Sequence, residues 1–361
     1  MRIFFNNTIF FLRRYGGISR YIVCLAEQLI QDKFDVKIIA PIFKNRYLNQ
    51  ISRKNLNGIY IKRFPPLKIF EIYSDLIFKN NIKKWQPNIV HDTYYSNNLS
   101  FCKNSAKIVT IHDLIHEKFS KLYATDKKLI KSKILKYADH FICVSKNTQK
   151  DLINYYNIPK NKTSVIYHGA DHLNKKKLQY NNKLFSKPFV LFVGSRTKYK
   201  NFEIIPKSFS LSKKVKDNVN IVCFGGNKFA HDEKKRFREL QFNENQIIQI
   251  DGNDNLLENL YSQAMALIFP SIYEGFGFPL LEAMKMGCPV IASKKSVMSE
   301  ICGNAAKYFD PLSSDELIGV IEKILYSDET KVSLINKGFL NVSNFTWKNC
   351  AKNTLKVYNK F

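Results

Sequence analysis

Hydrophobic residues form short continuous runs along the chain, separated by segments in which apolar positions recur at helical spacing. Runs such as Phe189–Val193 and Ala266–Phe269 contain no alternating polar residues, which is typical of parallel strands buried on both faces of a sheet. The amphipathic segments between them complete strand–helix–strand units, so the pattern predicts an α/β protein with doubly wound parallel sheets. The expected strands are Arg2–Phe5, Val36–Ala40, Ile89–His91, Ile108–Ile111, His140–Val144, Ser164–Tyr167, Phe189–Val193, Asn220–Phe224, Ile247–Ile250, Ala266–Phe269 and Pro289–Ala292.

A polar stretch over Asp171–Pro188 interrupts this pattern and is typical of a linker between domains. The length of 361 residues suits two domains of ordinary size. We therefore expect one Rossmann-like domain over residues 1–172 and a second over residues 173–345, facing a central cleft. Residues 346–361 have the spacing of an amphipathic helix. The apolar positions of that helix are Trp347, Ala351, Leu355 and Tyr358.

The net charge of +27 and the pI near 9.6 indicate an anionic partner, which can be nucleic acid, an acidic membrane face or a phosphorylated ligand. Residues 1–172 carry +17 of this charge and residues 173–361 carry +10. The basic residues are dispersed and the aromatic residues form no recognised RNA-binding signature. Nucleic acid is therefore the partner that the sequence favours least.

Seven cysteines are scattered along the chain without a C-x-x-C pair. Cys143, Cys223 and Cys288 lie in or beside apolar runs, so we expect reduced, buried thiols in a cytosolic protein. Met1–Phe5 passes directly into a first strand and does not resemble a signal peptide. No stretch approaches the roughly 20 apolar residues that a membrane span needs. These features predict a cytoplasmic protein.

The segment between Glu274 and Glu282 places two carboxylates around a glycine–aromatic turn that opens a predicted helix. Pro279 suits the first helical position, and Gly287 suits the residue just past the helix end. The glycines of the turn expose the backbone to a ligand, and the helix N-terminus offers N–H groups to phosphate. Glu282, in the first helical turn, is expected to accept hydrogen bonds from sugar hydroxyls. An ordinary strand–loop–helix crossover explains the same spacing about equally well.

A basic loop follows the first predicted strand of the second domain. Gly194 permits a turn there, and Arg196 and Lys200 are spaced so that both can converge on one diphosphate. A solvated basic loop is the alternative interpretation. Asp251 and Gly252 end another strand and are weaker candidates for contact with a nucleotide base.

Two further motifs follow predicted strands of the first domain. Gly16 and Gly17 permit close approach of a phosphate, although they do not form the dinucleotide-binding fingerprint. His112 can donate to a sugar hydroxyl or a departing phosphate, and Asp113 can orient a partner. His91 is a weaker candidate on the acceptor side. A tight turn and structural histidines are the alternatives.

A basic amphipathic segment spans residues 118–136, where leucine and isoleucine alternate with lysine. Such a helix suits an anionic membrane surface. A solvated outer helix of the sheet explains the same pattern. The lysines of this segment are Lys118, Lys121, Lys127, Lys128, Lys131, Lys133 and Lys136.

Together these motifs resemble the family-4 retaining glycosyltransferases of the GT-B fold, over nearly the whole chain. The resemblance implies two Rossmann-like domains around a cleft, with the closing helix crossing back to the first domain. One departure is Tyr167-His168-Gly169, where family members often have Pro-Asn-Gly near the hinge. The matching elements are the Gly16-Gly17 loop, Thr110–Asp113, Val144-Ser145, the Arg196/Lys200 loop, the two glutamates with seven residues between them, and Phe345–Trp347.

The resemblance also implies transfer of a sugar from a nucleotide-diphosphate donor with retention at the anomeric carbon. Arg196 and Lys200 match the pair that binds the diphosphate. Glu274 matches the residue that contacts the donor sugar, and Glu282 the residue that contacts the ribose. His112 matches the histidine near the donor sugar, and catalysis would rest on His112, Arg196, Lys200 and Glu274. The backbone positions expected along the donor are Gly16, Gly17, Gly275, Phe276, Gly277 and Phe278.

No metal and no cofactor are implied, because cationic side chains can replace the usual divalent ion. The Gly194–Asn201 loop and the Gly16–Tyr21 segment resemble the subset that builds bacterial surface polysaccharides such as O-antigen. Several members of that subset use GDP-mannose, so the resemblance favours mannose weakly. The acceptor would be a glycan or a lipid-linked oligosaccharide, with the protein peripheral on the inner face of the cytoplasmic membrane. The alternatives are a UDP-hexose donor, a nucleotide-sugar epimerase or phosphorylase on the same fold, and a non-catalytic binder of anionic surfaces.

Overall fold

The chain is described by a computed structural model that covers residues 1–361 except 7, 13, 63–66, 96, 123–130, 133, 174–182 and 197. The side chains of residues 67–72, 97, 98 and 122 also lie outside the description. Two compact units are present, one formed by residues 1–169 and 346–361 and the other by residues 170–345. The change of unit at residue 170 lies close to the linker expected from the sequence. No helix in the described part of the chain is long and apolar enough to cross a membrane.

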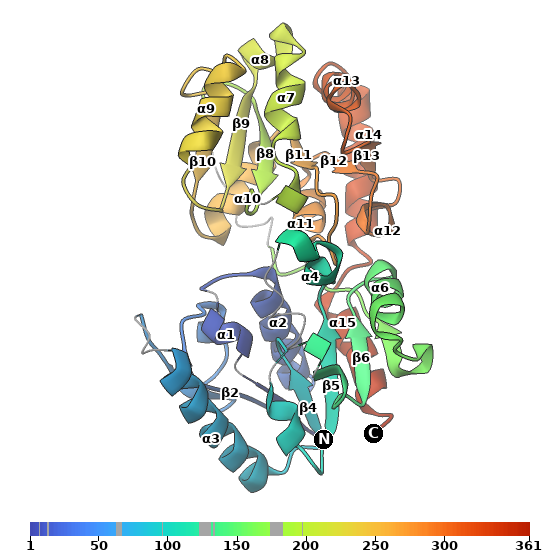
Figure 1. Cartoon of the computed structure of the whole chain (residues 1–361). Helices are drawn as coiled ribbons and strands as arrows, with labels where there is room; N and C mark the ends of the chain where they lie inside the picture. Colours follow the sequence, from blue (N-terminus) through green and yellow to red (C-terminus); the bar gives the residue numbers. More distant parts are fainter. Residues whose placement is uncertain are drawn as a thin grey trace. The chain divides into compact units, whose positions relative to one another are not determined.

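The first unit is built on a seven-stranded sheet in the order β3-β2-β1-β4-β5-β6-β7. Its recorded strand pairs are parallel, and the register places Ile3 beside both Val36 and Ile89. Figure 1 shows α3 next to β2. The strands are β1 (Arg2–Phe5), β2 (Asp35–Phe43), β3 (Leu56–Tyr60), β4 (Ile89–Asp92), β5 (Ala106–Ile111), β6 (His140–Cys143) and β7 (Thr163–Val165). The described α-helices are α1 (Thr8–Leu12), α2 (Gly17–Gln31), α3 (Leu67–Trp85), α4 (Ile115–Lys118), α6 (Lys146–Tyr156) and α15 (Trp347–Tyr358).

The second unit is built on a six-stranded parallel sheet in the order β10-β9-β8-β11-β12-β13. In Figure 1, α9 lies at the β10 edge, and α13 and α14 lie towards the β13 edge. The strands are β8 (Phe189–Val193), β9 (Asn220–Phe224), β10 (Ile247–Ile250), β11 (Ala266–Phe269), β12 (Val290–Ser293) and β13 (Ala306–Phe309). The helices are α7 (Ile204–Ser210), α8 (Lys213–Asn218), α9 (His231–Glu239), α10 (Asp254–Gln263), α11 (Phe278–Met286), α12 (Met298–Cys302), α13 (Ser314–Leu325) and α14 (Asp328–Val342), with a 3-10 turn η6 (Lys198–Lys200).

The doubly wound α/β prediction is confirmed, and every predicted strand is present within a few residues. Two strands, β3 and β13, were not predicted. Both lie at sheet edges, and β3 is largely exposed while β13 carries Lys307, so neither shows the continuous apolar run of a central strand. The prediction of buried free thiols holds for six cysteines, whereas Cys24 is half-buried.

The closing helix α15 belongs to the first unit, where it packs against α2. The backbone approaches Gly169 closely there, since a Cβ at that position would stand 2.3 Å from the Trp347 nitrogen. The ring of Trp347 is stacked on that of His168 at an interplanar angle of 27°, with centroids 6.2 Å apart. Of the apolar positions expected on this helix, Leu355 is only half-buried, and Thr354 is fully buried instead.

The first testable expectation concerns the N-terminus of α15, where the Thr346 hydroxyl accepts a hydrogen bond of 3.1 Å from the Asn349 N–H. Replacing Thr346 by alanine is expected to lower the free energy of unfolding by about 1 kcal/mol, because one helix-terminal N–H loses its partner. Urea denaturation of the whole chain measures this change. The control is Ser343→Ala, an exposed hydroxyl bonded only to the Leu340 carbonyl. An equal effect of both substitutions would contradict the capping role.

Candidate active site

Two carboxyl-end loops of the second unit bring a lysine and a glutamate together. Strands β8 and β11 are neighbours in the sheet, so the loops that follow them emerge side by side. Lys200 from the first loop places its Nζ 2.6 Å from Oε1 of Glu274 in the second. The two atoms form a close ion pair. Both side chains are mostly buried, with 15% and 11% exposed, so solvent screens this pair only weakly.

The backbone of the Glu274 loop is held by the side chain of Ser296. The Ser296 hydroxyl donates to the Glu274 carbonyl at 3.0 Å and accepts from its N–H at 3.3 Å. Gly277 has φ 100°, a left-handed conformation that favours glycine, and it precedes the first residue of α11. Gly287 closes the helix with φ 77°, as predicted.

Two details of the predicted helix were wrong. Phe278 is the first residue of α11, so Pro279 takes the second helical position. Glu282 consequently lies in the second turn, and no acidic residue stands in the first turn. The helix start therefore does not explain the orientation of the Glu282 carboxylate, which tertiary contacts hold instead.

Glu282 is buried and held by two residues that were not predicted. Its Oε2 accepts a hydrogen bond of 2.9 Å from the Tyr261 hydroxyl, and its Oε1 lies 3.5 Å from Nε2 of His172. Tyr261 is fully buried on α10. No local pattern marks Tyr261, because its apolar neighbours make it look like an ordinary core residue of an amphipathic helix.

Arg196 is paired with Glu233, another residue that was not predicted. Nε of Arg196 lies 2.6 Å from Oε1 of Glu233. Burial raises the pKa of Glu233, but hydrogen bonds from Arg196 and the Ala230 N–H outweigh this effect, so its pKa lies below the ordinary value. Glu233 is accordingly ionised at neutral pH.

The remaining donor residues predicted in the second unit follow strands at the same edge of its sheet. Phe276 is buried, with its ring centroid 5.4 Å from that of Phe278. Gly194 has φ 123°, so the turn after β8 favours glycine. Asp251 and Gly252 are exposed at the end of the edge strand β10.

In the first unit, His112 follows β5 and is buried against the Tyr21 ring, with centroids 5.7 Å apart. Burial lowers its pKa to about 4, although the charge of Asp113 opposes this, so the imidazole is neutral at pH 7. It hydrogen-bonds to the backbone of Thr93, while Nε2 is buried without a partner in the described part of the chain. Because the bond to Thr93 favours a proton on Nδ1, Nε2 is available as an acceptor.

His91 is a core residue, and its prediction as an acceptor-side contact was wrong. Its side chain is fully buried, with Nδ1 2.6 Å from the Tyr358 hydroxyl and Nε2 2.7 Å from the Thr110 hydroxyl. Burial lowers the pKa of His91 to about 3. Both ring nitrogens are therefore committed inside the protein.

The other first-unit candidates have visible structural roles. Oδ1 of Asp113 accepts a hydrogen bond of 3.1 Å from the Ile115 N–H, which fixes the turn before α4. Gly16 has φ 168°, an extended conformation that any residue adopts, and Gly17 begins α2. The backbone conformation at Gly16 thus does not require glycine.

Several predicted site residues share an uncommon property. Buried side-chain polar atoms normally have hydrogen-bond partners. Within the described residues, Nε2 of His112 and Nη1 of Arg196 are buried and lack one, whereas Oε1 of Glu274 is engaged by the ion pair with Lys200. Such atoms can accept or donate a hydrogen bond to a polar ligand, although several buried atoms away from the predicted site share the property.

Two family models match the chain in succession. Glycosyltransferase Family 4 covers residues 15–172, and Glycosyl transferases group 1 covers residues 174–340. The chain belongs to the family-4 glycosyltransferases. It is accordingly an enzyme that transfers a glycosyl group, on two Rossmann-like domains of the GT-B type.

Known glycosyltransferases match at low to moderate identity. An uncharacterized glycosyltransferase of Methanocaldococcus jannaschii is 22% identical over 96% of this chain and 95% of its own length. The O-antigen chain mannosyltransferase RfbU of Salmonella typhimurium is 33% identical over 49% of this chain and 48% of its own. In fold, the chain resembles Anabaena Alr3699/HepE in complex with UDP-glucose, with a TM-score of 0.78, 15% identity and full coverage of both chains.

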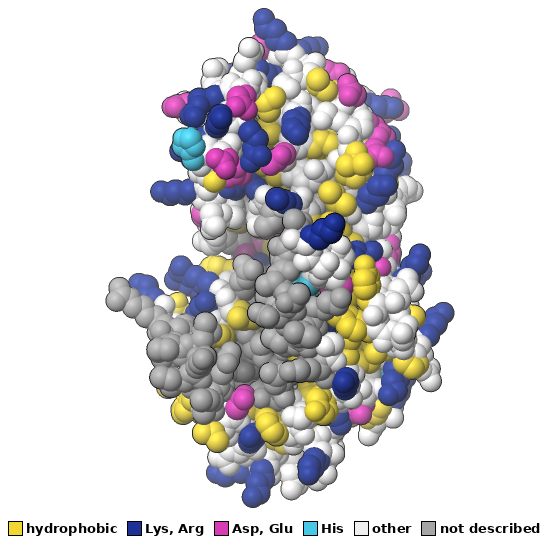
Figure 2. Space-filling model, in the orientation of Figure 1, with side chains coloured by type: hydrophobic (Ala, Val, Ile, Leu, Met, Phe, Trp, Pro, Cys, Tyr) yellow, Lys and Arg dark blue, Asp and Glu magenta, His cyan; other side chains and the backbone are white. Residues whose placement is uncertain are grey.

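The basic segment of this glycosyltransferase was predicted as a surface helix, and Lys131 does not fit that prediction. Its side chain is buried, with Nζ 3.0 Å from Oε1 of Glu117 and 2.9 Å from the Asp113 carbonyl. Lys127, Lys128 and Lys133 lie outside the described residues. On the face shown in Figure 2, Lys and Arg side chains are spread widely and lie among Asp and Glu side chains.

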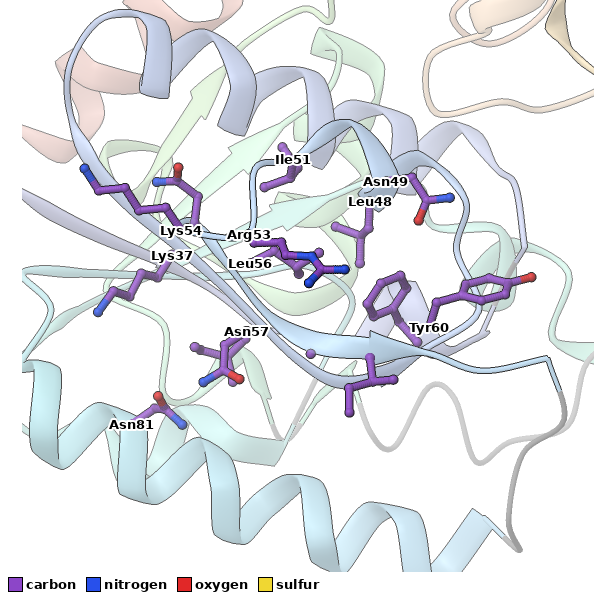
Figure 3. Close-up of a pocket in the computed structure, with 15 residues that line it drawn as sticks. Lys37, Leu48, Asn49, Ile51, Arg53, Lys54, Leu56, Asn57, Tyr60 and Asn81 are labelled. Atoms are coloured by element: carbon purple, nitrogen blue, oxygen red, sulfur yellow. The ribbon is translucent and has the colours of Figure 1, made fainter.

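A hollow of about 770 Å³ in the first unit lies along β2 and β3 of the glycosyltransferase (Figure 3). Lys37, Arg53 and Lys54 line it, together with Asn81 from α3. None of the predicted site residues lines this hollow. Ligands of open parallel sheets bind beyond the carboxyl ends of the strands, whereas this hollow follows the strands along their length. We therefore do not assign it to the donor.

Proposed function

We propose that this glycosyltransferase moves a hexose, with retention, from a nucleotide-diphosphate sugar to a hydroxyl of a glycan or lipid-linked oligosaccharide in bacterial surface-polysaccharide biosynthesis. The observation that carries the proposal lies in the second unit, where Lys200 meets Glu274 and Nη1 of Arg196 is buried without a partner in the described residues. Phosphates of a nucleotide sugar would supply partners to these cations. Mannose from GDP-mannose is favoured, since the relative RfbU is an O-antigen mannosyltransferase.

In the second unit, Arg196 and Lys200 are proposed to bind the diphosphate. Lysine is a mobile point charge, so Lys200 can turn from Glu274 towards phosphate when the donor binds. Glu274 would then accept hydrogen bonds from the donor sugar, and Glu282 from the ribose. The positive charges of Arg196 and Lys200 stabilise the negative charge that develops on the leaving phosphate, which is an electrostatic contribution to catalysis. No metal ion takes part in this proposal.

In the first unit, Nε2 of His112 is proposed to accept a hydrogen bond from a hydroxyl of the donor sugar. The imidazole is neutral at pH 7, so it does not add charge beside the sugar. Gly16 and Gly17 would lie near the distal phosphate. The acceptor hydroxyl would lose its proton to the leaving phosphate and attack from the same face, and the protein contributes positioning.

If the acceptor is lipid-linked, the enzyme acts at the inner face of the cytoplasmic membrane. The excess of positive charge in residues 1–172 supports attraction to anionic lipids there. We propose peripheral association through this charge. Part of the basic segment, residues 123–130, lies outside the described residues.

The second expectation tests the donor site by thermal unfolding without metal, in the presence of GDP, UDP, ADP, GDP-mannose, UDP-glucose or UDP-N-acetylhexosamines. A ligand at 100 times its dissociation constant stabilises the folded state by about 2.7 kcal/mol, which gives a clear rise in melting temperature. We expect GDP and GDP-mannose to give the largest shifts. The control is Lys200→Ala, in which the shift should become much smaller.

If none of the nucleotides raises the melting temperature of the folded protein, the proposed donor site is contradicted. If only UDP and UDP-glucose raise the melting temperature, the donor is a UDP-hexose and the proposed site residues are unchanged. UDP-hexose is the second candidate, because HepE, which this chain resembles in fold, binds UDP-glucose.

A further inference from the structure

The guanidinium of Arg196 is held on three sides before any donor binds. Its Nε and Nη2 lie 2.6 and 3.3 Å from the two carboxylate oxygens of Glu233, and Nη2 also donates to the Asn227 carbonyl at 2.7 Å. The ring of Phe229 lies 4.5 Å from the guanidinium carbon. Only 6% of the side chain is exposed. Arg196 therefore has one orientation imposed on it by its neighbours.

Glu233 is itself fixed by the start of a helix. It is the third residue of α9, and its Oε2 accepts a hydrogen bond of 2.8 Å from the Ala230 N–H. A carboxylate at this position satisfies a free N–H and interacts favourably with the helix dipole. The backbone of α9 thus sets the orientation of the carboxylate, and the carboxylate sets that of Arg196.

The remaining nitrogen of Arg196 points to the loops after β8 and β9. Nη1 is buried and has no partner in the described part of the chain. A Cβ at Gly226 would stand 3.1 Å from Nη1 and 3.3 Å from the Gly194 carbonyl. Glycine at position 226 therefore keeps side-chain atoms away from this nitrogen, in the region where the proposed function needs a phosphate.

Removal of the Glu233 charge has two opposing effects on an incoming anion. It relieves the repulsion between a carboxylate and a phosphate, which favours binding. It also leaves a buried guanidinium without its counter-ion, and such a charge is strongly disfavoured unless it moves to water. Since Arg196 is almost fully buried, the second effect dominates, and Nη1 would leave the loops that it now faces.

We propose that Glu233 is a positioning residue for donor binding, which holds Arg196 so that Nη1 meets the diphosphate of a nucleotide sugar. This inference rests on the proposed function. It assigns to α9 a part in donor recognition, through a residue that does not itself touch the donor. An alternative role, in which Glu233 occupies the phosphate position and must leave it, predicts the opposite change in affinity.

The third expectation is tested with Glu233→Gln, in which the amide oxygen can still accept from the Ala230 N–H and preserve the start of α9. Binding of GDP and of guanosine is measured by titration, with UDP and uridine as a second pair. We expect the dissociation constant for the diphosphate to rise about tenfold, because one charge-assisted hydrogen bond is lost. Binding of the nucleoside, which carries no phosphate, should change less than about twofold.

Two further variants sharpen the test. Glu203→Gln breaks an exposed ion pair with Arg236 of α9, in which the charged atoms lie 2.9 Å apart. This variant should bind both ligands like the wild type. Glu233→Asp keeps the charge and should retain more diphosphate affinity than Glu233→Gln. Unchanged or tighter diphosphate binding by folded Glu233→Gln would overturn the inference. An equal loss for nucleoside and diphosphate would overturn it as well, because it would indicate general damage to the unit.

The inference and the proposed function can fail separately. Wild-type protein that binds neither GDP nor UDP removes the proposed donor site and the inference together. Wild-type protein that binds a diphosphate, with the same affinity in Glu233→Gln, removes the inference alone. Thermal unfolding of each variant without ligand shows that the comparison is made on folded protein.

Discussion

Replacing Lys200 or Glu274 by alanine is expected to lower the turnover number about 100- to 1000-fold, the range seen when one preorganised group that stabilises transition-state charge is removed. The two side chains meet at 2.6 Å beside the glycine-rich turn that precedes α11. In Lys200→Ala a positive charge is missing when the diphosphate leaves. In Glu274→Ala the donor sugar loses an acceptor, and Lys200 loses the carboxylate that holds it. Initial rates of sugar transfer from GDP-mannose to the acceptor measure both effects.

The matched control for these variants is Lys294→Ala. Lys294 also forms an ion pair, 3.0 Å from Glu316, but both side chains are well exposed. Pairs of this kind contribute little to stability, and this one lies outside the proposed site. Lys294→Ala should therefore retain wild-type turnover. Near-normal rates in both Lys200→Ala and Glu274→Ala would contradict the site assignment.

The second large effect is expected at Tyr358, which ties α15 to the core of the first unit. Its hydroxyl lies 2.6 Å from Nδ1 of His91, and its side chain is 1% exposed. Tyr358→Ala should lower the free energy of unfolding by about 3–5 kcal/mol, since a large buried aromatic ring is replaced by a cavity. Tyr358→Phe keeps the ring but leaves a buried nitrogen of His91 unpaired, which costs about 1–3 kcal/mol.

Chemical denaturation of the whole chain measures both changes. Phe361→Ala is the control, because this aromatic residue of the same C-terminal segment is 59% exposed. Its effect should stay within about 0.5 kcal/mol. If Tyr358→Phe were as stable as the wild type, the hydrogen bond to His91 would not contribute to the stability of this unit.

The sequence pattern predicted local backbone conformation at the site but not the burial and long-range partners of its side chains. Gly287 was identified correctly as the residue just past the helix end, because the left-handed conformation that closes a helix depends mainly on local residues. His91 and Lys131 were misjudged, since a histidine at a strand end and a lysine in a basic segment give no sign of burial. Their partners, Tyr358 and Glu117, come from elements that the local pattern does not relate to them.

The sequence by itself determined the strand-and-helix alternation, the presence of two sheets, and the family to which the chain belongs. These depend on residue periodicity and on short motifs, which remain visible without coordinates. The tertiary structure alone decided that Lys200 meets Glu274, that Tyr261 holds Glu282, and that Glu233 holds Arg196. The physical reason is that each of these contacts depends on strand order and on the removal of water, and neither is encoded in the spacing of residues along the chain.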